Sequence, residues 1–169
     1  MKIVFMILVL LLPFVACADM ETDPWTPLQF LVGTWQGDGK AEDASGKGVT
    51  TFDWEVGHQV LVRRDRTEYS ATAQPPAFTY EALMVIYKNP ASNKIEAQYF
   101  DGGNHVIHYK LAPGSQPDSA QFVSDASGGP RFRLSYKLAN GKDLSVTFEM
   151  QPPSSSVFQM IASGVVHKQ

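Results

Sequence analysis

The chain contains a single cysteine, Cys17, among its 169 residues. A disulfide framework, a cysteine-based zinc site and a catalytic thiol in the folded part are therefore excluded, and packing alone must hold the fold. The sequence also has no run of basic residues. Its 14 Lys and Arg and 17 Asp and Glu give a net charge of −3 at pH 7. Nucleic acid and anionic membrane surfaces are consequently not expected partners.

Signatures of the common enzyme classes are also absent. The sequence contains no Gly-x-Ser-x-Gly, no His-Glu-x-x-His, no phosphate-binding loop and no cluster of Cys and His. Asp53 and Glu55 share a strand face, but Phe52 and Trp54 on the opposite face mark them as the wet side of a half-buried strand. We therefore expect a non-catalytic protein with no catalytic residue, no metal and no cofactor, and keep an enzyme acting on a bound ligand as an alternative.

An apolar run from Ile3 to Val15 follows Met1 and Lys2. The run is shorter than the roughly 20 residues that cross a bilayer, and it is typical of a secretory signal. We expect a signal peptide over 1–18, a linker over 19–27 and one domain over 28–169. About 150 residues are enough for one domain with a substantial core.

Two ways of processing the signal stay open. The small residues Ala16 and Ala18 favour cleavage before Asp19, whereas Val15-Ala16-Cys17 resembles a bacterial lipobox, which would leave an acylated Cys17 at the new N-terminus. Both predict an exported protein, either periplasmic or secreted. A lipid on Cys17 would be the protein's only expected contact with a membrane. The sequence does not indicate the oligomeric state.

Turn-forming clusters recur throughout the rest of the chain, with no convincing helical period between them. The clusters predict about ten short strands. Asn140-Gly141 is typical of a two-residue type I′ hairpin, so neighbouring strands should pair antiparallel. Alternation puts Phe132, Leu134 and Tyr136 on one face of a strand. A meander this long exposes two edges unless it closes, so we expect an all-β, up-and-down antiparallel barrel.

The stretch from Leu28 to Gly39 carries a family resemblance. Its pattern Leu-x-Phe-Leu-x-Gly-x-Trp-x-Gly-x-Gly, which includes Gly33 and Trp35, resembles the opening of calycin barrels: lipocalins, fatty-acid-binding proteins and nitrobindins. The resemblance implies a short N-terminal helical turn, Trp35 as a plug at the closed end, and Lys168 as its basic stacking partner. It also implies a closing strand, expected over Val157–Val166, that pairs with the strand of Trp35.

Charged residues crowd one predicted strand, Val60–Tyr69, where alternation sends at least one arginine into the barrel whichever face is inner. Arg64 and Arg66 on one face are the candidates for binding a ligand carboxylate, as internal arginines do in fatty-acid-binding proteins. The alternative is that both face water and pair with acids. Further candidates for ligand binding at inward positions are Tyr99, His105, Tyr109 and Tyr136.

Nitrobindins hold haem through a histidine near the start of the closing strand, but this chain has Phe158, Gln159 and Met160 there. Haem is therefore a minor alternative. The leading hypothesis is binding or transport of a small apolar or amphipathic molecule in the barrel. The rival is a structural or interaction module of the cell envelope whose barrel is filled by its own side chains.

Overall fold

The computed structural model describes residues 23–41, 44–70, 77–125 and 129–169. These residues contain ten strands and one short 3-10 turn. The signal segment and Cys17 lie outside the described residues. The elements are η1 (Thr26–Leu31), β1 (Gly33–Ala41), β2 (Ala44–Glu55), β3 (Val60–Tyr69), β4 (Phe78–Lys88), β5 (Ile95–Asp101), β6 (Val106–Leu111), β7 (Ser119–Ser124), β8 (Arg131–Ala139), β9 (Asp143–Gln151) and β10 (Gln159–Lys168).

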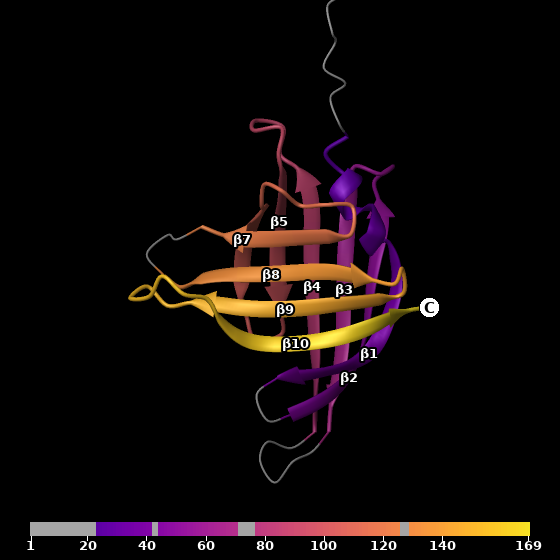
Figure 1. Ribbon diagram of the computed structural model, residues 1–169, viewed down its shortest axis with the longest axis vertical. Coiled ribbons are helices and arrows are strands. Elements are labelled where there is room, and N and C mark those ends of the chain that lie inside the picture. The colour runs from indigo at the N-terminus through magenta and orange to yellow at the C-terminus, as the bar shows by residue number, and fades with distance from the viewer. Residues whose placement is uncertain (1–22, 42–43, 71–76, 126–128) are drawn as a thin grey trace, which may run out of the picture.

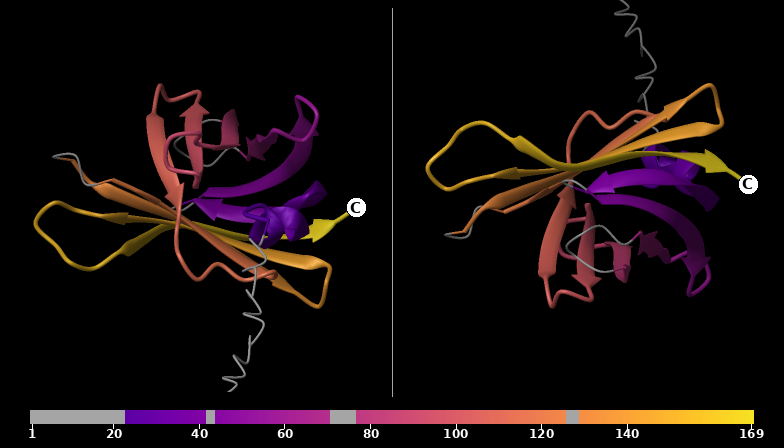
Figure 2. Two further views of the ribbon diagram at one scale, coloured as in Figure 1. Left: turned by 90° about the horizontal axis from the view of Figure 1, so that it is seen from above. Right: turned by 90° about the horizontal axis from the view of Figure 1, so that it is seen from below.

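Each strand pairs antiparallel with its neighbours in sequence, and β1 also pairs with β10, so the sheet closes into a barrel. The all-β, up-and-down barrel expected from the turn spacing is confirmed. The closing strand pairs with the strand of Trp35 as expected, but it begins at Gln159 and runs to Lys168. In Figure 1 the strands β7 to β10 run across the view, and β3, β4 and β5 cross behind them. Figure 2 shows the same two walls from above and below.

The connection between β8 and β9 follows the chemistry of its two central residues. Asn140 and Gly141 have φ angles of 53° and 68°, and the N–H of Lys142 donates to the carbonyl of Ala139 at 3.1 Å. A type I′ turn needs positive φ at both central positions, which Asn and Gly tolerate best. The expected hairpin turn is present.

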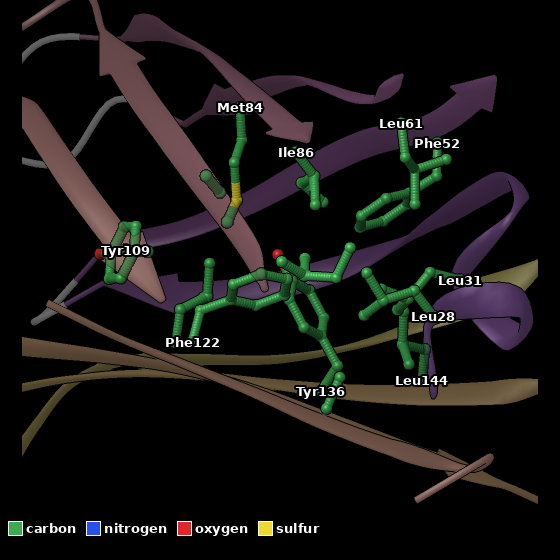
Figure 3. Close-up of a cluster of buried hydrophobic side chains, with 14 of the residues drawn as sticks. Leu28, Leu31, Phe52, Leu61, Met84, Ile86, Tyr109, Phe122, Tyr136 and Leu144 are labelled. Carbon is green, nitrogen blue, oxygen red and sulfur yellow. The ribbon is translucent and has the colours of Figure 1, made fainter. Parts of the chain in front are cut away.

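The hydrophobic core lies inside the barrel. It is built from alternate residues of each strand, because successive side chains point to opposite faces of the sheet. The inward side chains of β8 include Leu134 and Tyr136, which are 4% and 2% exposed, as the alternation predicted. Figure 3 shows Phe122 and Tyr136 from one wall and Met84 and Ile86 from the other pointing into the same interior. The buried apolar cluster extends from η1 through the middle of the barrel.

One end of the barrel is closed by η1. Leu28 and Leu31 are fully buried there, and Trp25 packs edge-on against Trp54 of β2 at 4.9 Å between ring centroids. Gly33 has a φ of 118°, a conformation that favours glycine, and it turns the chain from η1 into β1. Within the described residues, no helix is long and apolar enough to cross a membrane.

Trp35 fills the space under η1. Its side chain is fully buried, and the indole Nε1–H donates to the carbonyl of Leu31 at 2.7 Å, which satisfies the single polar atom of the ring. The Nζ of Lys168 lies 5.2 Å from the ring centroid. Trp35 therefore has the place at the closed end, and the basic partner, that the resemblance implied.

Candidate functional site

The inward arginine of β3 is Arg63. It shares the inner face with Leu61 and Asp65, and 13% of its side chain remains exposed. Its Nε donates to Oδ1 of Asp65 at 2.9 Å and lies 2.7 Å from Oδ2. Residues two apart on a strand face the same way, so this ion pair is formed within one strand.

Asp65 is the acidic half of the pair, with 6% of its side chain exposed. Its Oδ1 also accepts a hydrogen bond from the Thr50 hydroxyl of the adjacent β2 at 2.7 Å. Its Oδ2 is buried and makes no hydrogen bond to any described residue, although it touches the Arg63 guanidinium. An ion pair buried in this way keeps both charges only while both partners are present.

Tyr136 of β8 meets Arg63 across the barrel. Its hydroxyl accepts a hydrogen bond from Arg63 Nη1 at 2.7 Å, and the guanidinium carbon lies 5.6 Å from the ring centroid. Edge-on contacts with Phe52 and Phe122 hold the ring in place. Burial raises the pKa of Tyr136 despite the opposing effect of Arg63, so the phenol stays protonated.

Arg63 keeps its charge in this setting. Burial works to lower its pKa, but Asp65, Tyr136 and Tyr99 together raise it above the usual value. The Nη2 of Arg63 has no hydrogen-bond partner among the described residues, and the same holds for the hydroxyl of Tyr109. Two donors in the barrel interior therefore remain available.

A second polar group surrounds Asp101, at the end of β5. Its Oδ2 accepts a hydrogen bond from the Tyr80 hydroxyl at 2.9 Å, and the Tyr99 hydroxyl, 3.3 Å from Oδ2, donates its one proton to either Oδ2 or the Tyr80 oxygen. Its Oδ1 accepts from the backbone N–H groups of Gly103 and His105 at 2.9 and 3.0 Å. Asp101 thus ties the loop between β5 and β6 to the inner face.

The titration of this group follows from those contacts. Burial works to raise the pKa of Asp101, but the backbone N–H of His105, the Tyr80 hydroxyl and the His105 ring outweigh it and lower the pKa. Burial raises the pKa of Tyr80 to about 12, with Asp101 adding to the shift and Tyr99 opposing it. At neutral pH the group is therefore an ionised carboxylate held by neutral phenols.

Of the two alternatives for Arg64 and Arg66, the inward, ligand-binding placement is wrong and the outward one, paired with acids, is present. Their side chains are 53% and 59% exposed and pair with acids on the outside, Arg64 with Glu55 at 3.3 Å and Arg66 with Glu81 at 2.6 Å. Arg66 also lines an outer groove of about 290 Å³ between β1, β2 and β3. Leu61 on the inner face is fully buried, and Val62 on the face of Arg64 and Arg66 is 7% exposed, so both faces of β3 carry an apolar residue at this end of the strand.

Sequence analysis weighed both faces of β3 but singled out the wrong one. The signal that identifies the inner face was present. Arg63 and Asp65 on the inner face neutralise each other, whereas Arg64, Arg66 and Glu68 on the other face leave one positive charge uncompensated. Thr50 and Asp101 were not singled out, because Thr50 binds Asp65 of β3, and Asp101 has partners in β4 and in the loop after β5.

The other candidate residues divide between interior and rim. Tyr109 and Tyr136 are buried on the inner face, and Tyr99 is partly buried there, with its ring edge-on to Tyr109 at 6.4 Å between centroids. The inward placement expected for His105 is wrong, because its side chain is 70% exposed and its Nδ1 lies 3.0 Å from Asp101. Asn104 has a φ of 64°, which ends the strand alternation before it reaches His105.

The inner face offers no histidine for a haem iron. His105 lies at the rim, His108 contacts Glu96 at 3.0 Å, His167 contacts Asp143 at 2.7 Å, and His58 has a φ of 65° in the turn after β2. These four are all the histidines of the chain. Among the described residues, no group of three His, Cys, Asp or Glu side chains is arranged to hold a metal ion. The residues present do not fit a histidine-ligated haem.

The barrel end opposite η1 differs in its inner lining. Inner-face residues there are only partly buried, in contrast to the fully buried Leu61 and Phe52 nearer η1. They come from β2, β3, β4, β5, β8 and β9: Thr50, Thr67, Tyr80, Tyr99, Phe132 and Phe148. The Arg63 pair lies between this lining and the buried core, and the Asp101 group lies beside it.

Comparisons with known proteins yield structural neighbours only. No protein-family model matches the chain, and no curated protein matches it. A de novo designed fluorescence-activating β-barrel is 12% identical with a TM-score of 0.43, over 83% of this chain and 95% of that one. An S-type phycobiliprotein lyase from Guillardia theta is 8% identical with a TM-score of 0.48, over 83% and 88% of the two chains. A redesigned β-barrel solved with the compound DFHBI is 14% identical with a TM-score of 0.35, over 85% and 99%.

Proposed function

We propose that this protein is a calycin-like barrel that binds a small, largely apolar molecule with one polar end, without chemical conversion. The observation that carries the proposal is the position of Arg63, a cation in mid-barrel with 13% of its side chain exposed, whose Nη2 has no hydrogen-bond partner among the described residues. In proteins, charged groups removed from water usually have all their hydrogen-bonding atoms paired. A polar group that enters from the partly exposed end would meet this nitrogen.

The lining supports an amphipathic occupant. Binding sites for small molecules are mainly apolar with a few well-placed polar groups. Aromatic and aliphatic side chains dominate the interior, and the polar atoms gather around Arg63 and Asp101. The opening motif with Gly33 and Trp35, and the stacking of Lys168 on Trp35, support the calycin relationship.

The rival function is a filled barrel that serves as a structural or interaction module. Aromatic contacts on the inner face favour it, because Phe132 and Phe148 of the adjacent β8 and β9 stack at 5.6 Å between centroids and Tyr136 meets both Phe52 and Phe122 edge-on. Side chains packed so closely can occupy the space that a ligand needs. Ligand titration separates the two functions.

The test is a titration with N-phenylnaphthylamine, an uncharged dye that fluoresces in apolar surroundings. We expect saturable binding that Val146→Phe on the inner face weakens and Thr147→Phe on the outer face of the same strand leaves unchanged. A dye signal equally insensitive to both substitutions would locate binding outside the barrel. The absence of binding would favour the filled barrel.

Export belongs to the same proposal. We infer from the apolar run before Cys17 that the domain works outside the cytoplasm, free or anchored through a lipid on that cysteine. A location in the periplasm or beyond suits a carrier of poorly soluble molecules. The mass of the mature N-terminus distinguishes the two forms.

A further inference from the structure

We propose that the occupant of the barrel is an uncharged amphipathic molecule with a carbonyl acceptor, such as an ester, ketone or amide, and not a fatty-acid anion. The inference rests on the proposed function and specifies its ligand class. It follows from the partner that Arg63 already has.

The first step concerns charge. Asp65 lies 2.7 Å from the Arg63 guanidinium and neutralises it, and Asp101 adds a second carboxylate on the inner face nearer the mouth. Among the described side chains, the remaining cations with an inward register are Lys168, which lies over Trp35 at the closed end, and Lys88, which is exposed at the end of β4. The interior around Arg63 therefore carries no surplus positive charge.

The second step concerns the cost of an anion. A ligand carboxylate at Arg63 would lose its hydration and would lie near the Asp65 carboxylate in surroundings of low dielectric, where like charges repel strongly. The attraction of the guanidinium would be shared with Asp65. A neutral carbonyl loses far less hydration and meets no repulsion.

The third step concerns the hydrogen-bonding groups that are left. Arg63 Nη2 and the Tyr109 hydroxyl are without partners among the described residues, and both can donate. Asp65 Oδ2 also makes no hydrogen bond, but it lies 2.7 Å from the Nε of Arg63, which compensates its charge. The register puts Arg63 and Tyr109 in adjacent rows, because Arg63 aligns with Met84 and Tyr99, and Tyr109 aligns with Ala97 and Ile86. Hydrogen-bond donors on the inner face suit a ligand whose polar end accepts hydrogen bonds and donates none.

The experiment compares two ligands of equal chain length, methyl decanoate and decanoate, as competitors of bound N-phenylnaphthylamine below their micelle concentrations. At neutral pH we expect the ester to displace the dye at roughly tenfold lower concentration than the anion. Asp65→Asn frees the guanidinium and keeps the shape of the side chain, so the preference should shift toward decanoate by about tenfold. Asp53→Asn, an exposed carboxyl on the outer face of β2, is the matched control and should leave the ratio unchanged.

A second arm needs no variant and covers a failure of Asp65→Asn to fold. As the pH falls toward about 4, decanoate takes up a proton and should approach the affinity of the ester in the wild-type protein. Equal binding of ester and anion at neutral pH, or an unchanged ratio in Asp65→Asn, would overturn the inference and leave the binding function intact. Absence of dye binding and of both ligands would instead reject the binding function itself.

Discussion

The ammonium of Lys168 lies 5.2 Å from the centroid of the Trp35 indole, in strands whose register makes these two residues direct partners. The penultimate residue of the chain thus covers the first tryptophan of the barrel wall. One face of the indole meets this cation, and its N–H is bonded to Leu31 of η1. The closed end is therefore assembled from both ends of the domain.

Replacing Lys168 by Met removes the cation from the indole and keeps the aliphatic stem. We expect the free energy of unfolding to fall by about 0.5 to 1 kcal/mol, the usual size of a cation–π contact near the surface. Lys137→Met, at an exposed position of β8, is the control. Urea unfolding at low and high salt measures the free energy of unfolding of each variant. Equal losses for the two substitutions would show that the cation over Trp35 does not stabilise the fold.

The buried pair predicts a strong dependence between two substitutions. Asp65→Leu alone leaves the Arg63 charge uncompensated and should cost about 3 to 5 kcal/mol, whereas adding Arg63→Met should restore most of that loss. Guanidinium unfolding of the single and double variants gives the coupling energy. Additive losses would mean that the two side chains do not act as a pair.

The lowered pKa of Asp101 sets a pH dependence of stability. A carboxyl with a lowered folded-state pKa stabilises the fold above its unfolded pKa of about 3.9 and loses this contribution as the pH falls through the folded value. Wild type should therefore exceed Asp101→Asn in stability most at neutral pH, and the gap should close below about pH 4. Urea midpoints over this range measure it, with amide exchange of Gly103 as a local readout. A gap that is constant with pH would contradict the prediction.

Gly37 is required where β1 meets β10. A Cβ at this position would lie 2.4 Å from the carbonyl oxygen of Val165, a backbone atom that cannot move aside without disturbing the closing pair of strands. Gly37→Ala should cost about 1 to 3 kcal/mol, as overpacked sites do. Gly129→Ala has open space around it and should stay within about 0.5 kcal/mol of wild type in thermal unfolding.

The mature N-terminus is predicted to begin at one of two residues. Mass spectrometry of the membrane fraction and of the soluble exported fraction should find an acylated Cys17 in the first or an unmodified Asp19 in the second. A chain that retains Met1 in both fractions would contradict export.

The barrel could be predicted from the sequence because its signals are local. Asn140-Gly141 encodes a turn, and the alternation from Phe132 to Leu138 encodes a half-buried strand. These patterns act over a few residues and need no knowledge of distant partners. Closure was predicted because a meander of about ten strands would otherwise leave two exposed edges.

The interior could be predicted only in part, because alternation gives two faces and leaves the choice between them to tertiary packing. For β3 both faces carry an apolar residue, and packing gave the inward role to Arg63 and not to Arg64. For His105 the pattern failed because Asn104 takes a positive φ just before it. Asp101 was missed because its tyrosine partners come from the inner faces of β4 and β5 and its N–H donors from a loop.

The pairing of β1 with β10 has a consequence for biosynthesis. Until β10 has been synthesised and has paired, β1 has one unpaired edge and the indole of Trp35 lacks its cover, so the barrel cannot close. Removal of residues 159–169 should accordingly leave a chain that aggregates through its two open edges.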